Sequence, residues 1–174
     1  MEKLLDLIGF VFRAHSEGAT KPSKAVRKWD GRTPYATHPV WCAMTLLTET
    51  TLPESLRQRG AAALLLHDVL EDTTFGLPEG TPEDVRALVD EMTFESSDEE
   101  MKQIWSKSNE VKLLKLYDKT SNLLDGVWMS PEKRGRYMVY LLQLCESVQP
   151  IYGELNIIRI ARAVCAVNFS DEGK

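Results

Sequence analysis

Four ionisable side chains stand within six residues at positions 67–72, directly after a run of apolar residues. They are His67, Asp68, Glu71 and Asp72. The preceding run, 61–66, contains no polar residue, which is typical of a helix buried on nearly all sides. At about 100° per residue, the three carboxylates project from the face that this helix has just buried. Because buried unpaired charges are costly and close carboxylates repel one another, the spacing predicts a positive charge among them.

A second segment places polar side chains in line with apolar ones. One helical stripe, roughly 80° wide, holds Val111, Leu114, Asp118, Asn122 and Asp125. The lysines of the same segment, at positions 112, 115 and 119, are expected to point elsewhere. The pattern predicts that Asp118 is a further carboxylate aimed into the interior.

His38 completes a set of donors that suits a metal ion. It directly precedes Pro39, a residue that fits the first position of a helix. Together with His67, Asp68 and Asp118, it supplies two imidazoles and two carboxylates. Such a mixed nitrogen and oxygen set suits Mn²⁺, Fe²⁺ or Co²⁺, with the remaining positions left to water. A divalent ion of this kind lowers the pKa of its bound water and produces a hydroxide nucleophile near neutral pH.

The segments that position these residues are expected to be helical. Apolar residues at helical spacing and start signals predict helices near 2–15, 39–48, 53–70, 82–92, 109–125, 131–147 and 151–167. Sustained period-two alternation is missing from the sequence, so strands are not expected. The prediction is an all-α protein, a single compact helical bundle of about seven or eight helices that forms one domain over residues 1–174.

The amino-acid composition disfavours several classes of function for this protein. With 21 Lys and Arg against 26 Asp and Glu, the formal net charge is −5, which disfavours non-specific binding to nucleic acid or to an anionic membrane. Three cysteines without CxxC spacing predict neither a disulfide framework nor a cysteine metal site. The longest apolar run is far shorter than the roughly 20 residues that span a bilayer, and the first segment does not resemble a signal peptide. The expected location is the cytoplasm.

One loop departs from the acidic average. Between residues 16 and 35 the chain carries Gly18, Pro22, Gly31 and Pro34, which predict a loop. The same loop holds five basic residues, Lys21, Lys24, Arg27, Lys28 and Arg32. A few local cations of this kind can hold a small phosphorylated ligand. His15, just before the loop, is interpreted either as a core histidine or as support for the site.

Three blocks of sequence, in this order, resemble a known family. They are TPYATHP at 33–39, LLLHDVLEDT at 64–73, and VKL at 111–113 followed by DKTSNL at 118–123. They are similar to the hydrolase domain of RelA/SpoT proteins and to the small alarmone hydrolases, which are all-α HD-domain metal-dependent phosphohydrolases. These enzymes remove pyrophosphate from the 3′ position of guanosine tetra- and pentaphosphate (ppGpp and pppGpp) with Mn²⁺. The resemblance runs from about Leu4 to Asp125.

The resemblance implies a role for each matched residue. The implied metal ligands are His38, His67, Asp68 and Asp118, with Mn²⁺ or another divalent transition metal as the cofactor. Glu71 and Asp72 would orient or deprotonate the water and serve the leaving group. Arg27 would bind the base, Lys28 the phosphate or ribose oxygens, and Asn122 the ribose. The implied partner is a small phosphorylated nucleotide, with neither nucleic acid nor membrane; the oligomeric state is open, with a homodimer as one option.

The sequence departs from the family pattern in three places, and two further functions stay open beside the implied one. The segment between His15 and Arg27 is several residues longer than in the family, the segment between Asp72 and Val111 is shorter, and Ser121 replaces a histidine or tyrosine. One alternative is an HD-type phosphatase that acts on another nucleotide or a dinucleotide phosphate. The other is a non-catalytic HD module that senses a nucleotide.

Overall fold

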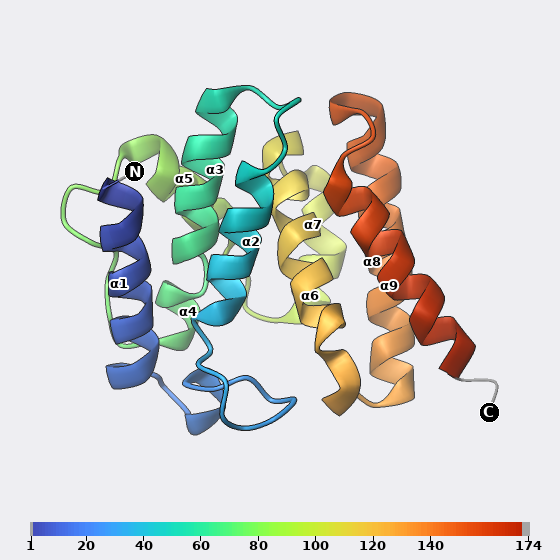
Figure 1. Cartoon of the computed structure of the whole chain (residues 1–174), viewed down its shortest axis with the longest axis horizontal. Coiled ribbons are helices and arrows are strands. Elements are labelled where there is room, and N and C mark those ends of the chain that lie inside the picture. Colours follow the sequence, from blue (N-terminus) through green and yellow to red (C-terminus); the bar gives the residue numbers. More distant parts are fainter. Residues whose placement is uncertain (1, 172–174) are drawn as a thin grey trace. The chain divides into compact units, whose positions relative to one another are not determined.

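The regular structure of the chain is helical. A computed structural model describes residues 2–171, and all its regular elements are α- or 3₁₀-helices (Figure 1). Extended pairing in this part of the chain is limited to two isolated bridges, between Ala19 and Thr73 and between Val26 and Pro34. The predicted all-α class is confirmed. None of the helices within residues 2–171 combines the length and apolar character needed to cross a membrane.

The helices form two compact units, which we call the N-terminal unit (Met1–Glu95) and the C-terminal unit (Ser96–Lys174). The prediction of one domain over residues 1–174 stays a prediction. The N-terminal unit contains α1 (Glu2–Glu17), η1 (Pro22–Lys24), α2 (Thr37–Leu47), α3 (Glu54–Leu66), α4 (Val69–Asp72) and α5 (Glu83–Met92). Within it, α3 packs against α1, α2 and α5. This central place explains why residues 63–66 of α3 are fully buried.

The helix predicted over 53–70 is wrong in one respect, because it is interrupted at its chemically important end. Helix α3 ends at Leu66 and α4 begins at Val69, with His67 and Asp68 between them. The His67 Nδ1 atom lies 2.7 Å from the carbonyl oxygen of Leu64, the acceptor that a continuous helix would offer to the Asp68 amide. The two residues therefore occupy a junction, not the face of a single straight helix.

The basic loop is fastened to the end of α4. Beside the Ala19–Thr73 bridge, the Thr74 amide donates to the Gly18 carbonyl over 2.8 Å. A Cβ atom at Gly18 would stand 2.4 Å from the Phe75 ring, so this close approach requires glycine. Farther along, Asp30 Oδ1 accepts hydrogen bonds from the amides of residues 32 and 33, which closes the turn before α2.

The C-terminal unit is built around α7. Its elements are α6 (Ser97–Gln103), η2 (Ile104–Ser106), α7 (Asn109–Leu124), η3 (Gly126–Trp128), α8 (Pro131–Tyr152) and α9 (Asn156–Asp171). Helix α7 packs against α8 and α9. Serine side chains cap three of these helices, since the hydroxyls of Ser96, Ser108 and Ser130 accept backbone amides of the first turn. Helix α8 continues through Pro150, beyond the predicted end at 147, and stops at Gly153, whose φ is +81°.

Candidate functional site

Two imidazoles in the N-terminal unit converge on one carboxylate. His38 comes from the first turn of α2, and His67 and Asp68 come from the junction between α3 and α4. The Nε2 atom of His67 lies 3.2 Å from Asp68 Oδ1, and the Nε2 atom of His38 lies 3.6 Å from Asp68 Oδ2. Both histidines are buried, with 2% of each exposed. Three of the four residues predicted as metal ligands therefore meet within this unit.

The hydrogen bonding of His67 determines its tautomer. Because the Leu64 carbonyl can only accept, the neutral His67 ring carries its proton on Nδ1, 2.7 Å away. The Nε2 atom, which lies beside Asp68, is then the one with a lone pair. Histidines that bind metals commonly donate their second ring nitrogen in this way, because the bond fixes both the tautomer and the orientation of the ring.

Tyr35 orients the Asp68 carboxylate, a role that the sequence analysis missed. Its hydroxyl donates to Asp68 Oδ2 over 2.8 Å. Burial, followed by the charge of Asp68, raises the pKa of Tyr35 well above its usual value, so the hydroxyl remains a donor. The His15 ring stacks on Tyr35 at 4.7 Å between centroids. The available signal was the place of Tyr35 in the block 33–39, three residues before His38.

The two acids with predicted proton roles have different surroundings. Asp72 is buried, and its Oδ1 atom lies 2.6 Å from the Lys24 ammonium. Burial and the charge of Asp68 raise the pKa of Asp72, whereas Lys24 opposes that rise. Glu71 is exposed, and its Oε1 atom accepts the Phe94 amide over 3.1 Å. The two carboxylates, which the sequence analysis assigns the same role, therefore differ in burial and in bonding partner.

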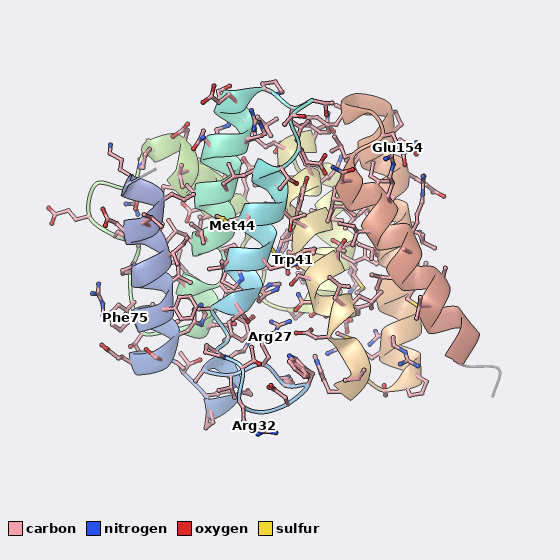
Figure 2. The ribbon with its side chains drawn as sticks, viewed as in Figure 1. Arg27, Arg32, Trp41, Met44, Phe75 and Glu154 are labelled. Carbon is pink, nitrogen blue, oxygen red and sulfur yellow. The ribbon has the colours of Figure 1, made fainter. Side chains whose placement is uncertain are left out.

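Arg27 and Lys28, which the sequence predicts to bind the nucleotide, also differ in their exposure to solvent. Arg27 is 5% exposed, and its guanidinium carbon lies 5.2 Å from the centre of the Tyr35 ring. Lys28 is exposed. Figure 2 shows Arg27 and Arg32 on the loop that precedes α2. The guanidinium of Arg27 is thus held next to the ring that orients Asp68, while Lys28 faces solvent.

Asp118, the fourth predicted ligand, lies in a buried cluster of charges within the C-terminal unit. Its Oδ2 atom is 3.2 Å from Lys115 Nζ and 3.2 Å from Lys119 Nζ. Its Oδ1 atom accepts the Asn122 side-chain amide over 2.7 Å. The expectation that these two lysines point elsewhere is wrong. Lys115 stands three residues before Asp118, a spacing that brings side chains together, and the four-carbon stem of Lys119 brings its ammonium back from a neighbouring face.

Glu100 of α6 balances the two lysines. Its Oε2 atom lies 3.1 Å from Lys115 Nζ and 2.9 Å from Lys119 Nζ, and its Oε1 atom accepts the Tyr140 hydroxyl over 3.0 Å. Burial lowers the pKa of Lys119, but Asp118 and Glu100 more than compensate and raise it well above its usual value. We call Glu100, Lys115, Asp118 and Lys119 the buried charge cluster; it contains two acids and two bases.

Comparisons with known proteins identify the fold. No family model and no curated protein matches the chain. Among solved structures, it is similar to one described as a metazoan ortholog of SpoT that hydrolyses ppGpp and plays a role in starvation responses. The two share 22% sequence identity with a TM-score of 0.67, and the match covers 99% of this chain and 97% of the other. The protein therefore shares the all-helical fold of that structure.

Proposed function

We propose that the protein is a metal-dependent phosphohydrolase that removes pyrophosphate from the 3′ position of guanosine tetra- and pentaphosphate. The observation that carries this proposal is the convergence of His38 and His67 on the carboxylate of Asp68. The solved structure with the same fold supports the substrate class, since that protein is described as hydrolysing ppGpp. The cytoplasmic location and the oligomeric state stay predictions.

The ion belongs to the proposal. We assign it to His38, His67 and Asp68 of the N-terminal unit, together with Asp118 of the C-terminal unit, and we expect Mn²⁺ or another divalent transition metal. The residues fit such an ion, because two imidazoles and two carboxylates are donors that Mn²⁺, Fe²⁺ and Co²⁺ accept. When bound, the ion supplies a polarising charge and lowers the pKa of a water molecule.

The chain's own residues would handle protons and the nucleotide. Asp72 and Glu71 lie within four residues of Asp68 and are proposed to orient or deprotonate the water and to serve the leaving group. Arg27 is proposed to bind the base and Lys28 the phosphate or ribose. Asn122, which donates to Asp118, is proposed to contact the ribose.

Removal of the Tyr35 hydroxyl should weaken metal binding. In Tyr35→Phe the ring can still stack on His15, but Asp68 Oδ2 loses its donor at 2.8 Å. Loss of a hydrogen bond that orients a ligand typically lowers metal affinity by about 10–100-fold, which is the expected range here. Isothermal titration calorimetry with MnCl₂ measures this affinity, and Tyr152→Phe, at the end of α8, is the matched control. Equal affinities in Tyr35→Phe and wild type would show that Tyr35 does not orient a ligand.

A substrate assay tests the proposed reaction. Purified protein with Mn²⁺ should convert guanosine tetraphosphate and water to GDP and pyrophosphate in equal amounts. Arg27→Ala should raise KM for this substrate, because the proposed contact with the base is lost. Turnover of other nucleotides with guanosine tetraphosphate left intact would instead identify a broader HD-type phosphatase. Nucleotide binding without turnover would identify a sensing module.

A further inference from the structure

The long basic loop presents one of its lysines to a proposed catalytic acid. The loop is fastened to Asp72 through its backbone, since the Thr20 amide and hydroxyl both donate to the Asp72 carbonyl, over 2.9 and 3.0 Å. It is also held at Lys24, whose carbonyl oxygen lies 3.1 Å from Nδ1 of the buried His15 ring. These contacts hold the loop on both sides of the Lys24 side chain. The position of Lys24 is therefore determined by the fold of the N-terminal unit.

Lys24 and Asp72 form a close ion pair. Their charged atoms are 2.6 Å apart, and the Asp72 side chain is only 5% exposed, whereas that of Lys24 is 33% exposed. A short contact between an ammonium and a buried carboxylate is a strong, charge-assisted hydrogen bond. It limits the rotation of the Asp72 carboxylate and favours its anionic form.

The Asp72 carboxylate is surrounded by polar side chains from several elements, and Lys24 contributes a positive charge. The others include Asp68 from the preceding turn, Tyr35 from the segment before α2, and His15 from α1. Tyr35 is neutral because burial raises its pKa, and burial lowers the pKa of His15, so its ring is neutral near pH 7. The negative charge of Asp68 works against a second anion at Asp72. The hydrogen bond from the Tyr35 side chain and the ammonium of Lys24 both favour the anion at Asp72, and Lys24 contributes the positive charge.

We propose that Lys24 is a positioning residue, whose ammonium holds the Asp72 carboxylate as the oriented anion that takes a proton from the attacking water. This inference rests on the proposed function for its catalytic consequence. It assigns the base role to Asp72 rather than to the exposed Glu71. It also gives a function to the segment between His15 and Arg27, where the sequence is longer than in the family it resembles.

The titration of Asp72 tests the ion pair without any turnover. In metal-free protein labelled with ¹³C-aspartate, the Asp72 carboxyl signal is identified by its absence in Asp72→Asn. Lys24→Met should raise the pKa of this carboxyl by about one unit, because an opposite charge at this distance lowers a carboxyl pKa by about 1–3 units. Lys24→Arg should restore the wild-type value. Lys21→Met, at an exposed position of the same loop, should leave it unchanged.

Kinetics then test the consequence for catalysis. For Lys24→Met, kcat should fall by about tenfold with KM within about twofold of wild type, because the contribution of a general base is lost in part. The acidic limb of the kcat profile should move to higher pH by the same amount as the carboxyl pKa, since a base with a higher pKa is protonated earlier as the pH falls. If Lys24→Met does not fold, Lys24→Gln, which keeps a donor without the charge, replaces it.

The possible outcomes test the positioning role of Lys24 separately from the proposed hydrolase function. An Asp72 titration that is the same in wild type and Lys24→Met would overturn the positioning role. A raised KM with unchanged kcat would also overturn it, because Lys24 would then contact the substrate directly. A wild-type protein that hydrolyses no nucleotide would contradict the proposed function, and the titration would still decide whether Lys24 holds Asp72 as an anion.

Discussion

Replacement of Asp68 by alanine should lower the turnover of guanosine tetraphosphate by roughly a thousandfold or more. The Asp68 carboxylate is the group on which His38 and His67 converge, at 3.6 and 3.2 Å. Without this anion, the two neutral imidazoles hold a divalent ion less tightly. A metal ion contributes several kcal/mol to catalysis, and about 1.4 kcal/mol corresponds to a factor of ten in rate.

Two measurements on the same samples check this expectation. Pyrophosphate release gives kcat/KM, and elemental analysis after dialysis against Mn²⁺ gives the bound metal. Asp68→Ala should lose both activity and stoichiometric metal. Asp90→Ala, an exposed aspartate of α5, should keep both. Turnover by Asp68→Ala above one tenth of the wild-type rate would contradict a role for Asp68 as a ligand.

Replacement of Glu100 by alanine should destabilise the protein by about 3–5 kcal/mol, the usual cost of removing one partner from a buried ion pair. Glu100 lies within 3.1 Å of both Lys115 and Lys119. Its removal leaves two buried ammonium groups with Asp118 as the acid that the cluster retains. The Tyr140 hydroxyl also loses the Glu100 carboxylate as its hydrogen-bond acceptor.

Urea unfolding measures the effect of Glu100 on stability. The matched control is Glu99→Ala, the neighbouring acid of the same helix, which contacts Gln103 near the surface and should change the free energy of unfolding by less than about 0.5 kcal/mol. A loss below about 1 kcal/mol for Glu100→Ala would show that the buried charge cluster does not depend on this carboxylate.

The fold class could be predicted from the sequence because it depends on local patterns. The apolar run at 61–66 predicts a buried helix, and α3 is the helix that packs against three others in its unit. The break after Leu66 was not accessible, because it involves a hydrogen bond between the His67 side chain and a backbone carbonyl. Periodicity describes where side chains point on a continuous helix. It does not show that a side chain replaces a backbone amide as the partner of a carbonyl group.

The candidate site could be predicted from the sequence only in part, for a similar reason. His38, His67 and Asp68 stand in short blocks whose residue types suggest a metal, and the structure brings these three together. The ion pair between Lys24 and Asp72 joins a loop to a helix that follows it by almost fifty residues. Its formation depends on how the loop is seated, which spacing within either segment does not reveal.

Helix geometry and side-chain flexibility explain the error in the C-terminal unit. Lys115 stands three residues before Asp118, a spacing that places the two side chains on one helix face, whereas the Cβ atom of Lys119 lies about 100° away; both ammonium groups reach the Asp118 carboxylate. Lysine has four rotatable methylene groups, so the position of its charge is not determined by the direction of its Cβ. The neutralising partner, Glu100, comes from a different helix.

We propose that His38, His67, Asp68 and Asp118 bind one divalent ion. Anomalous diffraction at the manganese edge, from crystals of the full chain grown with Mn²⁺, tests it most directly. We expect one strong anomalous peak within bonding distance of a donor atom from each of these four residues. A peak that is bonded to other residues, or to the N-terminal unit without Asp118, would contradict it.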